Sequence, residues 1–125
     1  MTAQALPRSI PAGIEIRGLR LLNLALEDAV AAIESAVLGG SKTHVAFVNA
    51  DCVNILHRQP AYRGALEQAD CIFADGIGVR LAARLTGHRL RDNVNGTDLF
   101  PVVCRMAAGA GVGIFLFGAR DGRAQ

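Results

Sequence analysis

The chain has 125 residues, of which 51% are hydrophobic and 19% charged, and its formal net charge is +2. This length suits one domain with a sizeable core, and the composition is that of a folded α/β protein and not of a disordered chain. The small net charge, with no dense run of Lys or Arg, argues against a nucleic-acid partner. No apolar run reaches about 18 residues, so the sequence predicts no membrane span.

The three cysteines, Cys52, Cys71 and Cys104, lie far apart within apolar runs. We expect them to be small buried side chains of a protein in a reducing compartment. Neither the cysteines nor the three histidines have the spacing of a metal site, so the sequence predicts no metal and no cofactor. The first residues lack the basic start and continuous apolar core of a signal peptide, which predicts a cytoplasmic protein.

The N-terminal region divides into an arm, a hairpin and a helix. Residues 1–13 carry two prolines and a glycine and are expected to form a loose arm, so that the domain occupies 14–125. Residues 14–22 alternate apolar and polar types around Gly18, as in a small hairpin or edge strand. Apolar residues then recur at helical spacing over 26–37, with two acids in the first turn and a Gly-Gly stop.

Short apolar runs alternate with helical patterns through the rest of the chain. Buried strands are predicted at 44–48, 71–74 and 112–117. Helices are predicted at 49–59, 60–68, 78–85 and 97–111, the last with Thr97 as its cap and Pro101 in its first turn. This alternation predicts a Rossmann-like open parallel sheet with helices on both faces, which stops after the third core strand.

Polar or glycine-rich turns follow all three predicted strands. Asn49 follows the first, Asp75 the second and Gly118 the third. The ligand crevice of an open parallel sheet lies beyond the carboxyl ends of its strands, so we expect these turns to line one pocket. Asp75 could instead cap the next helix, as acids often do, and the pattern leaves both interpretations open.

The turn at 75–78 is Asp-Gly-Ile-Gly, a carboxylate beside glycines that let a ligand approach the backbone closely. Such a carboxylate could act as a general base on a substrate hydroxyl or hydrogen-bond a sugar. Residues 93–100 join an Asn-Gly turn to a helix start whose backbone N–H groups would suit a phosphate without a metal. An ordinary loop before a capped helix is the alternative for that segment.

The segment 115–122, Phe-Leu-Phe-Gly-Ala-Arg-Asp-Gly, has the strand–glycine–helix shape of a nucleotide loop. It lacks the full GxGxxG spacing and a Walker lysine, so alone it is a weak indication. Arg91 and Arg120 are candidates for contacting a diphosphate, although loop arginines are commonly solvated.

Four motifs in this order resemble the WecG/TagA/CpsF glycosyltransferases, also called glycosyltransferase family 26. They are Asn-Ala-Asp at 49–51, Ala-Asp-Gly-Ile-Gly-Val at 74–79, Asn-Gly-Thr-Asp-Leu at 95–99 and Phe-Leu-Phe-Gly at 115–118, and the resemblance extends from about residue 14 to the last residue. It implies an inverting, metal-independent hexosyltransferase that moves a sugar from a UDP-sugar to a polyprenyl-diphosphate-linked saccharide. It also implies peripheral association with the inner face of the cell membrane, in cell-surface or exopolysaccharide synthesis.

The resemblance assigns roles to individual positions. Asp75 matches the aspartate of the family's D-G-I-G motif, which makes it the expected general base toward the acceptor hydroxyl. Asn49 is expected near the donor sugar, and Gly118 near the nucleotide. The full set of expected substrate-binding residues is Asn49, Gly76, Arg91, Asn95, Gly96, Thr97, Asp98 and Gly118.

The sequence departs from the family pattern in three ways. Phe47 stands where many relatives have threonine, and Asn93 stands where many have arginine, with Arg91 a doubtful substitute two positions earlier. Relatives are usually much longer, so we expect this chain to be the N-terminal part of such an enzyme. An incomplete sheet would leave a strand edge uncovered, which predicts dimerisation or aggregation. A nucleotide-binding module and a non-catalytic remnant that binds a partner through that edge are the alternatives.

Overall fold

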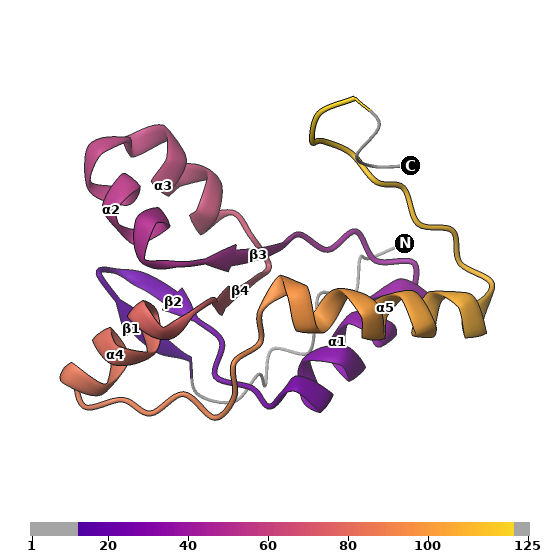
Figure 1. Cartoon of the computed structure of the whole chain (residues 1–125), viewed down its shortest axis with the longest axis horizontal. Helices are drawn as coiled ribbons and strands as arrows, with labels where there is room; N and C mark the ends of the chain where they lie inside the picture. The colour runs from indigo at the N-terminus through magenta and orange to yellow at the C-terminus, as the bar shows by residue number, and fades with distance from the viewer. Residues whose placement is uncertain (1–12, 122–125) are drawn as a thin grey trace.

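The computed structural model describes residues 13–121, so the predicted arm lies, apart from Gly13, outside the described residues (Figure 1). The elements alternate as a mixed α/β chain, which confirms the predicted fold class. In chain order they are β1 (Ile14–Ile16), β2 (Leu19–Leu21), α1 (Leu26–Leu38), β3 (Val45–Val48), α2 (Ala50–Arg58), α3 (Pro60–Glu67), β4 (Cys71–Ala74), α4 (Ile77–Leu85) and α5 (Gly96–Ala110).

The first two strands form the predicted hairpin. β1 and β2 pair antiparallel, with Ile14 opposite Leu21 and all the apolar side chains on one buried face. The turn between them places Arg17 at φ 54° and Gly18 at φ 78°, the positive values that a tight two-residue hairpin requires. Arg63 on α3 donates a 2.8 Å hydrogen bond to the Arg17 carbonyl, which ties this turn to the helical layer.

The parallel sheet is centred on β4. β3 and β4 pair in parallel, with Val48 opposite Ala74. On the other side of β4, Leu22 forms a parallel bridge with Phe73, and the Leu22 N–H donates to the Ile72 carbonyl at 2.8 Å. All four residues of β4 are therefore buried, whereas three of the four in β3 are only half-buried. β3 is the edge of this sheet within the described residues.

Alternate side chains of β4 enter two separate hydrophobic clusters. Ile72 and Ala74 pack with the β1–β2 hairpin and with buried residues of α2, α3 and α4. Cys71 and Phe73 pack with buried residues of α1 and α5. Because successive side chains of a strand point to opposite faces, this division places helices on both faces of the sheet, as predicted.

The predicted third strand at 112–117 does not form. No helix or strand is assigned to these residues, and Phe115 and Phe117 are 88% and 95% exposed. The apolar run predicted burial, but a strand also needs a hydrogen-bonded neighbour, and within the described residues β3 pairs only with β4. Gly111 ends α5 at φ 69°, and the yellow segment that follows turns back above α5 without joining the sheet (Figure 1).

An apolar groove of about 390 Å³ runs beside the edge of β3. It is lined by residues of α1, β3 and α5: Ile33, Val45, Phe47, Gly96, Leu99, Phe100 and Val103. The uncovered edge that the sequence led us to expect is therefore present in the described part of the chain. Nothing in the structure shows a second copy on it, so oligomerisation stays a prediction.

Phe73 is the side chain on which the second cluster most depends. It is 1% exposed, and its ring centroid lies 6.0 Å from that of Phe47. We expect Phe73→Ala to lower the free energy of unfolding by about 3–5 kcal/mol, because it leaves a cavity in a close-packed interior. Phe117→Ala is the matched control and should change it by less than about 0.5 kcal/mol. Urea unfolding of the two variants measures both, and equal losses would contradict the exposure of the 112–117 segment.

Candidate functional site

The turns after β3 and β4 lie side by side. Val48 and Ala74 are in register, and the Asp75 N–H donates a 2.9 Å hydrogen bond to the Val48 carbonyl. Asn49 and Asp75 are therefore neighbours at the carboxyl end of the sheet, as the sequence predicted. The helices that begin there are also in contact, because a Cβ added to Gly78 would lie 3.0 Å from the Ala50 Cβ. Gly78 lets α2 and α4 start this close together (Figure 1).

The Asp75 carboxylate does not cap α4. The N-cap residue of α4 is Gly76, which has φ 90° and provides no side-chain hydrogen bond. The capping interpretation of Asp75 is therefore wrong. Asp75 is half-buried, and its carboxylate has no hydrogen-bond or ion-pair partner among residues 13–121. Its oxygens are free to accept a hydrogen bond from a bound molecule.

Asn49 has one of its two polar groups committed to local structure. Its Oδ1 accepts a 2.9 Å hydrogen bond from the Cys52 N–H and so caps α2. This is the ordinary role of an asparagine before a helix. Asn49 is exposed, and its Nδ2 group is a donor with no partner among residues 13–121.

Asn23 and Asp92, which no sequence motif indicated, hold the 89–93 loop beside this edge. Asn23 Oδ1 accepts from the Arg91 N–H at 2.7 Å, and Asn23 Nδ2 donates to the Arg89 carbonyl at 3.0 Å. Asp92 Oδ2 accepts from the Leu26 N–H at 3.0 Å, at the start of α1. Ala25, the N-cap residue of α1, has no capping side chain, and this missing cap was the available signal for a partner such as Asp92.

The end of the same loop reaches the Asp75 turn. Asn93 Oδ1 lies 3.5 Å from the Gly76 N–H, a long hydrogen bond that links the loop to the glycine beside Asp75. Asn93 is the position where the family resemblance led us to expect arginine. Its contact here is with the backbone, and it places the loop against the turn.

Asn95 caps α5 in place of the predicted Thr97. Asn95 Oδ1 accepts from the Asp98 N–H at 2.8 Å, and Asn95 Nδ2 donates to Asp98 Oδ2 at 2.7 Å. The helix starts at Gly96, so Pro101 falls in its second turn and not in the first as predicted. We interpreted the Asn-Gly pair as a turn before the helix. An asparagine three residues before an acid is also a capping pattern, and it is the one that the structure shows.

The start of α5 is brought to β3 but is only partly open to a phosphate. Gly96 lies against the Phe47 ring, where an added Cβ would be 3.9 Å from the nearest ring atoms. The Asp98 N–H is already bonded to Asn95, and the exposed Asp98 carboxylate adds a negative charge. The backbone N–H groups of Gly96 and Thr97 remain, as first-turn donors that a helix leaves without internal partners.

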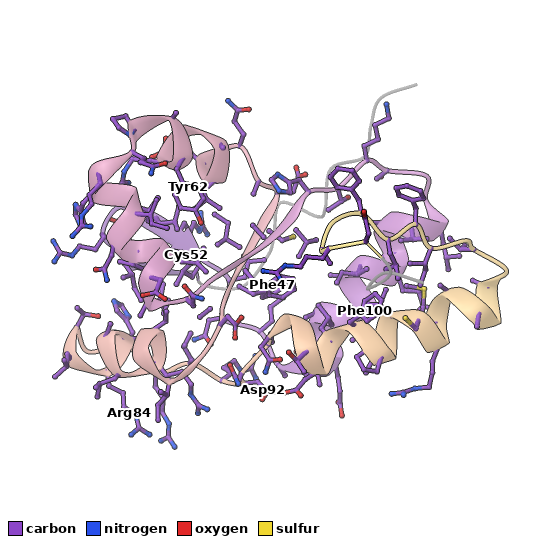
Figure 2. All side chains as sticks on the ribbon, turned by 45° about the horizontal axis from the view of Figure 1, so that its top comes forward. Phe47, Cys52, Tyr62, Arg84, Asp92 and Phe100 are labelled. Atoms are coloured by element: carbon purple, nitrogen blue, oxygen red, sulfur yellow. The ribbon has the colours of Figure 1, made fainter. Side chains whose placement is uncertain are left out.

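Two predicted site residues lie elsewhere. Gly118, with φ 119°, belongs to the exposed segment after α5, and Figure 1 shows this yellow segment on the other side of the view from the starts of α2 and α4. The exposed Arg91 side chain lines a pocket of about 90 Å³ with Arg80, Arg84 and Arg89. In Figure 2 the labelled Arg84 points away from the sheet on the outer side of α4. The structure therefore groups Asn49, Asp75, Gly76 and the 93–98 segment, and leaves these two outside that group.

Cys52 and Cys71 belong to the hydrophobic clusters of the fold. Burial, followed by the neighbouring Asp70 charge, raises the pKa of Cys71. A hydrogen bond with Cys52, together with burial, raises the pKa of Tyr62, and both residues lie in the cluster beneath α2 and α3 (Figure 2). The Cys71 thiol and the Tyr62 hydroxyl are thus protonated at neutral pH. The sequence predicted that all three cysteines are buried. Cys71 is buried, whereas Cys52 and Cys104 are only half-buried.

Two further properties follow from residues 13–121. No three His, Cys, Asp or Glu side chains gather there in a way that could hold a metal ion. None of the helices in this range is both long and apolar enough to cross a membrane.

Comparison with known proteins identifies the family of the chain. The sequence profile described as "Glycosyl transferase WecG/TagA/CpsF family" matches residues 14–125, and the chain therefore belongs to this family. A curated relative from Bacillus spizizenii is 36% identical over 62 residues. It is named N-acetylglucosaminyldiphosphoundecaprenol N-acetyl-beta-D-mannosaminyltransferase. The match covers 50% of this chain and 24% of the relative.

The cap of α5 provides a test of the local geometry of the site. We expect Asn95→Ala to lower the free energy of unfolding by about 1 kcal/mol, because the Asp98 N–H loses its acceptor. Thr97→Ala should have a much smaller effect, since Thr97 is exposed and does not cap the helix. Thermal or urea unfolding of both variants measures the difference. A larger loss in Thr97→Ala would return the cap to the position predicted from sequence.

Proposed function

We propose that this chain carries part of the active site of a glycosyltransferase that uses Asp75 as its general base. The observation that supports this most directly is a half-buried carboxylate, without a protein partner in the described residues, at the carboxyl end of the central strand. This is the position where open parallel sheets bind their ligands. Family membership supports the reaction class.

The proposed reaction is a single inverting displacement. The acceptor hydroxyl donates a hydrogen bond to the Asp75 carboxylate, and its oxygen attacks the anomeric carbon of a UDP-sugar from the face opposite the diphosphate. As the new C–O bond forms, the bond from the anomeric carbon to the diphosphate oxygen breaks, and the hydroxyl proton passes to Asp75. UDP leaves with the bonding electrons. General-base assistance of this kind contributes about 10²–10⁴-fold to a rate.

The charge that develops on the diphosphate needs nearby donors. The N-termini of α2 and α4 lie together at the strand ends, and that of α5 lies against Phe47. Helix N-termini supply backbone N–H groups and a partial positive charge, which favour a phosphate without a metal. α4 has no acid in its first turn, whereas α2 and α5 carry Asp51 and Asp98 there. We therefore propose the start of α4, with Gly76, as the main diphosphate contact.

The substrates follow from the relative. That protein is named for N-acetylmannosamine transfer to N-acetylglucosaminyl-diphosphoundecaprenol, and we propose the same class here, a UDP-N-acetylhexosamine donor and a polyprenyl-diphosphate-linked acceptor. Such an acceptor is anchored in a bilayer, so the enzyme would work at the cytoplasmic face of the cell membrane. Asn49 and Asn95 are proposed to contact the donor sugar. Gly118 and Arg91 lie outside the group around Asp75, and their contacts with substrate remain predictions.

Transfer of label from UDP-sugars to N-acetylglucosaminyl-diphosphoundecaprenol tests the base. We expect Asp75→Asn to reduce incorporation at least about 100-fold, because an amide cannot accept the hydroxyl proton. Asp28→Asn, an exposed acid in the first turn of α1, is the matched control and should leave incorporation unchanged.

Two results would count against the proposal. Equal incorporation by Asp75→Asn and the unmodified chain would remove Asp75 as the base. Incorporation by neither, with circular dichroism showing both chains folded, would favour the non-catalytic interpretation of this length of chain.

A further inference from the structure

Helix α4 presents a row of large apolar side chains to solvent. Ile77, Leu81 and Leu85 are 85%, 57% and 81% exposed and follow one another at intervals of four residues. The buried residues of the same helix are Val79 and Ala83. At about 100° of rotation per residue, those two point away from the exposed row by roughly half a turn. Packing among the described residues therefore does not explain why these three exposed side chains are apolar.

The same side of α4 is strongly cationic. Arg80 and Arg84 project from α4 beside the apolar row, and Arg89 and Arg91 from the following loop complete the lining of the 90 Å³ pocket. Residues 76–91 contain these four arginines, one histidine and no acid. The salt bridge found among residues 13–121 joins Arg63 and Glu67, on α3. The four guanidinium groups thus form no salt bridge with any described acid.

The nearest acids in sequence, Asp75 and Asp92, form no salt bridge with these arginines. Asp75 belongs to the turn before α4. Asp92 accepts hydrogen bonds from the backbone N–H groups of Leu26 and Asn93, and it is committed to the start of α1 and to its own loop. Asn23 also binds the backbone of Arg89 and Arg91, so the main chain of this loop is held beside α4. Hydrogen bonds within the fold therefore hold the backbone that carries the arginine pocket.

We propose that α4 and the loop to Arg91 form a membrane-docking face for anionic phospholipids. The arginines contact lipid phosphates, and Ile77, Leu81 and Leu85 enter the acyl boundary with the helix lying in the plane of the interface. A helix with an apolar row flanked by Arg is the pattern that binds such interfaces. An exposed apolar row of this kind is unusual on a soluble surface.

The positive charge of this face favours an anionic bilayer over a second copy of the chain as its partner. Two copies docked through this face would bring eight arginines together with no acid between them, and like charges at an interface are costly. An anionic bilayer supplies both phosphate groups and hydrocarbon in one surface. This inference extends the proposed function, because docking would bring the Asp75 turn, two residues before Ile77, close to a lipid-linked acceptor.

Vesicle flotation without any sugar donor tests the face independently of activity. The full chain is mixed with vesicles of phosphatidylcholine alone or of phosphatidylcholine with phosphatidylglycerol, at low and high salt. We expect binding to the anionic vesicles that weakens with salt, because screening shortens the range of the arginine charges. Arg80→Gln/Arg84→Gln should reduce partitioning about thirty-fold, from the attraction of an anionic surface for each arginine. Leu81→Gln/Leu85→Gln should reduce it at least about tenfold.

Matched controls come from other surfaces of the same chain. Leu38→Gln, at the exposed end of α1, and Arg58→Gln/Arg105→Gln, on α2 and α5, should bind within about twofold of the unmodified chain. Asp75→Asn should also bind normally, which separates a failure of docking from a failure of catalysis. Circular dichroism confirms that each variant is folded.

Three outcomes would overturn the inference. They are no binding of the unmodified chain to anionic vesicles, equal loss in the control variants, and a dimer in size-exclusion chromatography that Leu81→Gln/Leu85→Gln abolishes. The last would assign the apolar row to a second copy.

Discussion

The parallel pairing of β3 with β4 is the constraint on which the rest of the structure depends. β4 has a hydrogen-bonded neighbour on both sides and packs a hydrophobic cluster on each face, so its position admits little variation. The register between β3 and β4 then fixes where the backbone leaves the sheet after each strand. Asn49 and Asp75 become neighbours because Val48 and Ala74 are paired, and a shift of one residue would send these side chains to opposite faces.

The polar residues around this edge serve two purposes that differ in their energetics. Asn49 and Asn95 satisfy helix N-termini, and Asn23 and Asp92 hold a loop through its backbone, so removing any of them would leave a donor unpaired. Asp75 makes no such contact in the described residues. A carboxylate that does not stabilise its own surroundings, at the end of a buried strand and beside a glycine, is better suited to an incoming ligand than to structure.

Sequence patterns predicted the elements whose signals are local. The hairpin around Gly18, the helices between short apolar runs, and the shared strand edge at Asn49 and Asp75 were all found in this way. The 112–117 segment was predicted wrongly because its apolar run carries no information about a hydrogen-bonding neighbour. Asn23 and Asp92 were missed because their partners lie 66–68 residues away along the chain. Thr97 was chosen as a cap because the preceding Asn-Gly pair resembled a turn.

The proposed donor site lies at the carboxyl ends of β3 and β4. Nuclear magnetic resonance titration of the ¹⁵N-labelled chain with UDP and with UDP-N-acetylhexosamines tests this most directly. If the donor binds there, the amides of Asn49, Gly76 and Gly96, which lie at that edge, shift saturably, and the amides on α3 stay unchanged. Shifts confined to the segment around Gly118, with the amides beside Asp75 unmoved, would contradict it.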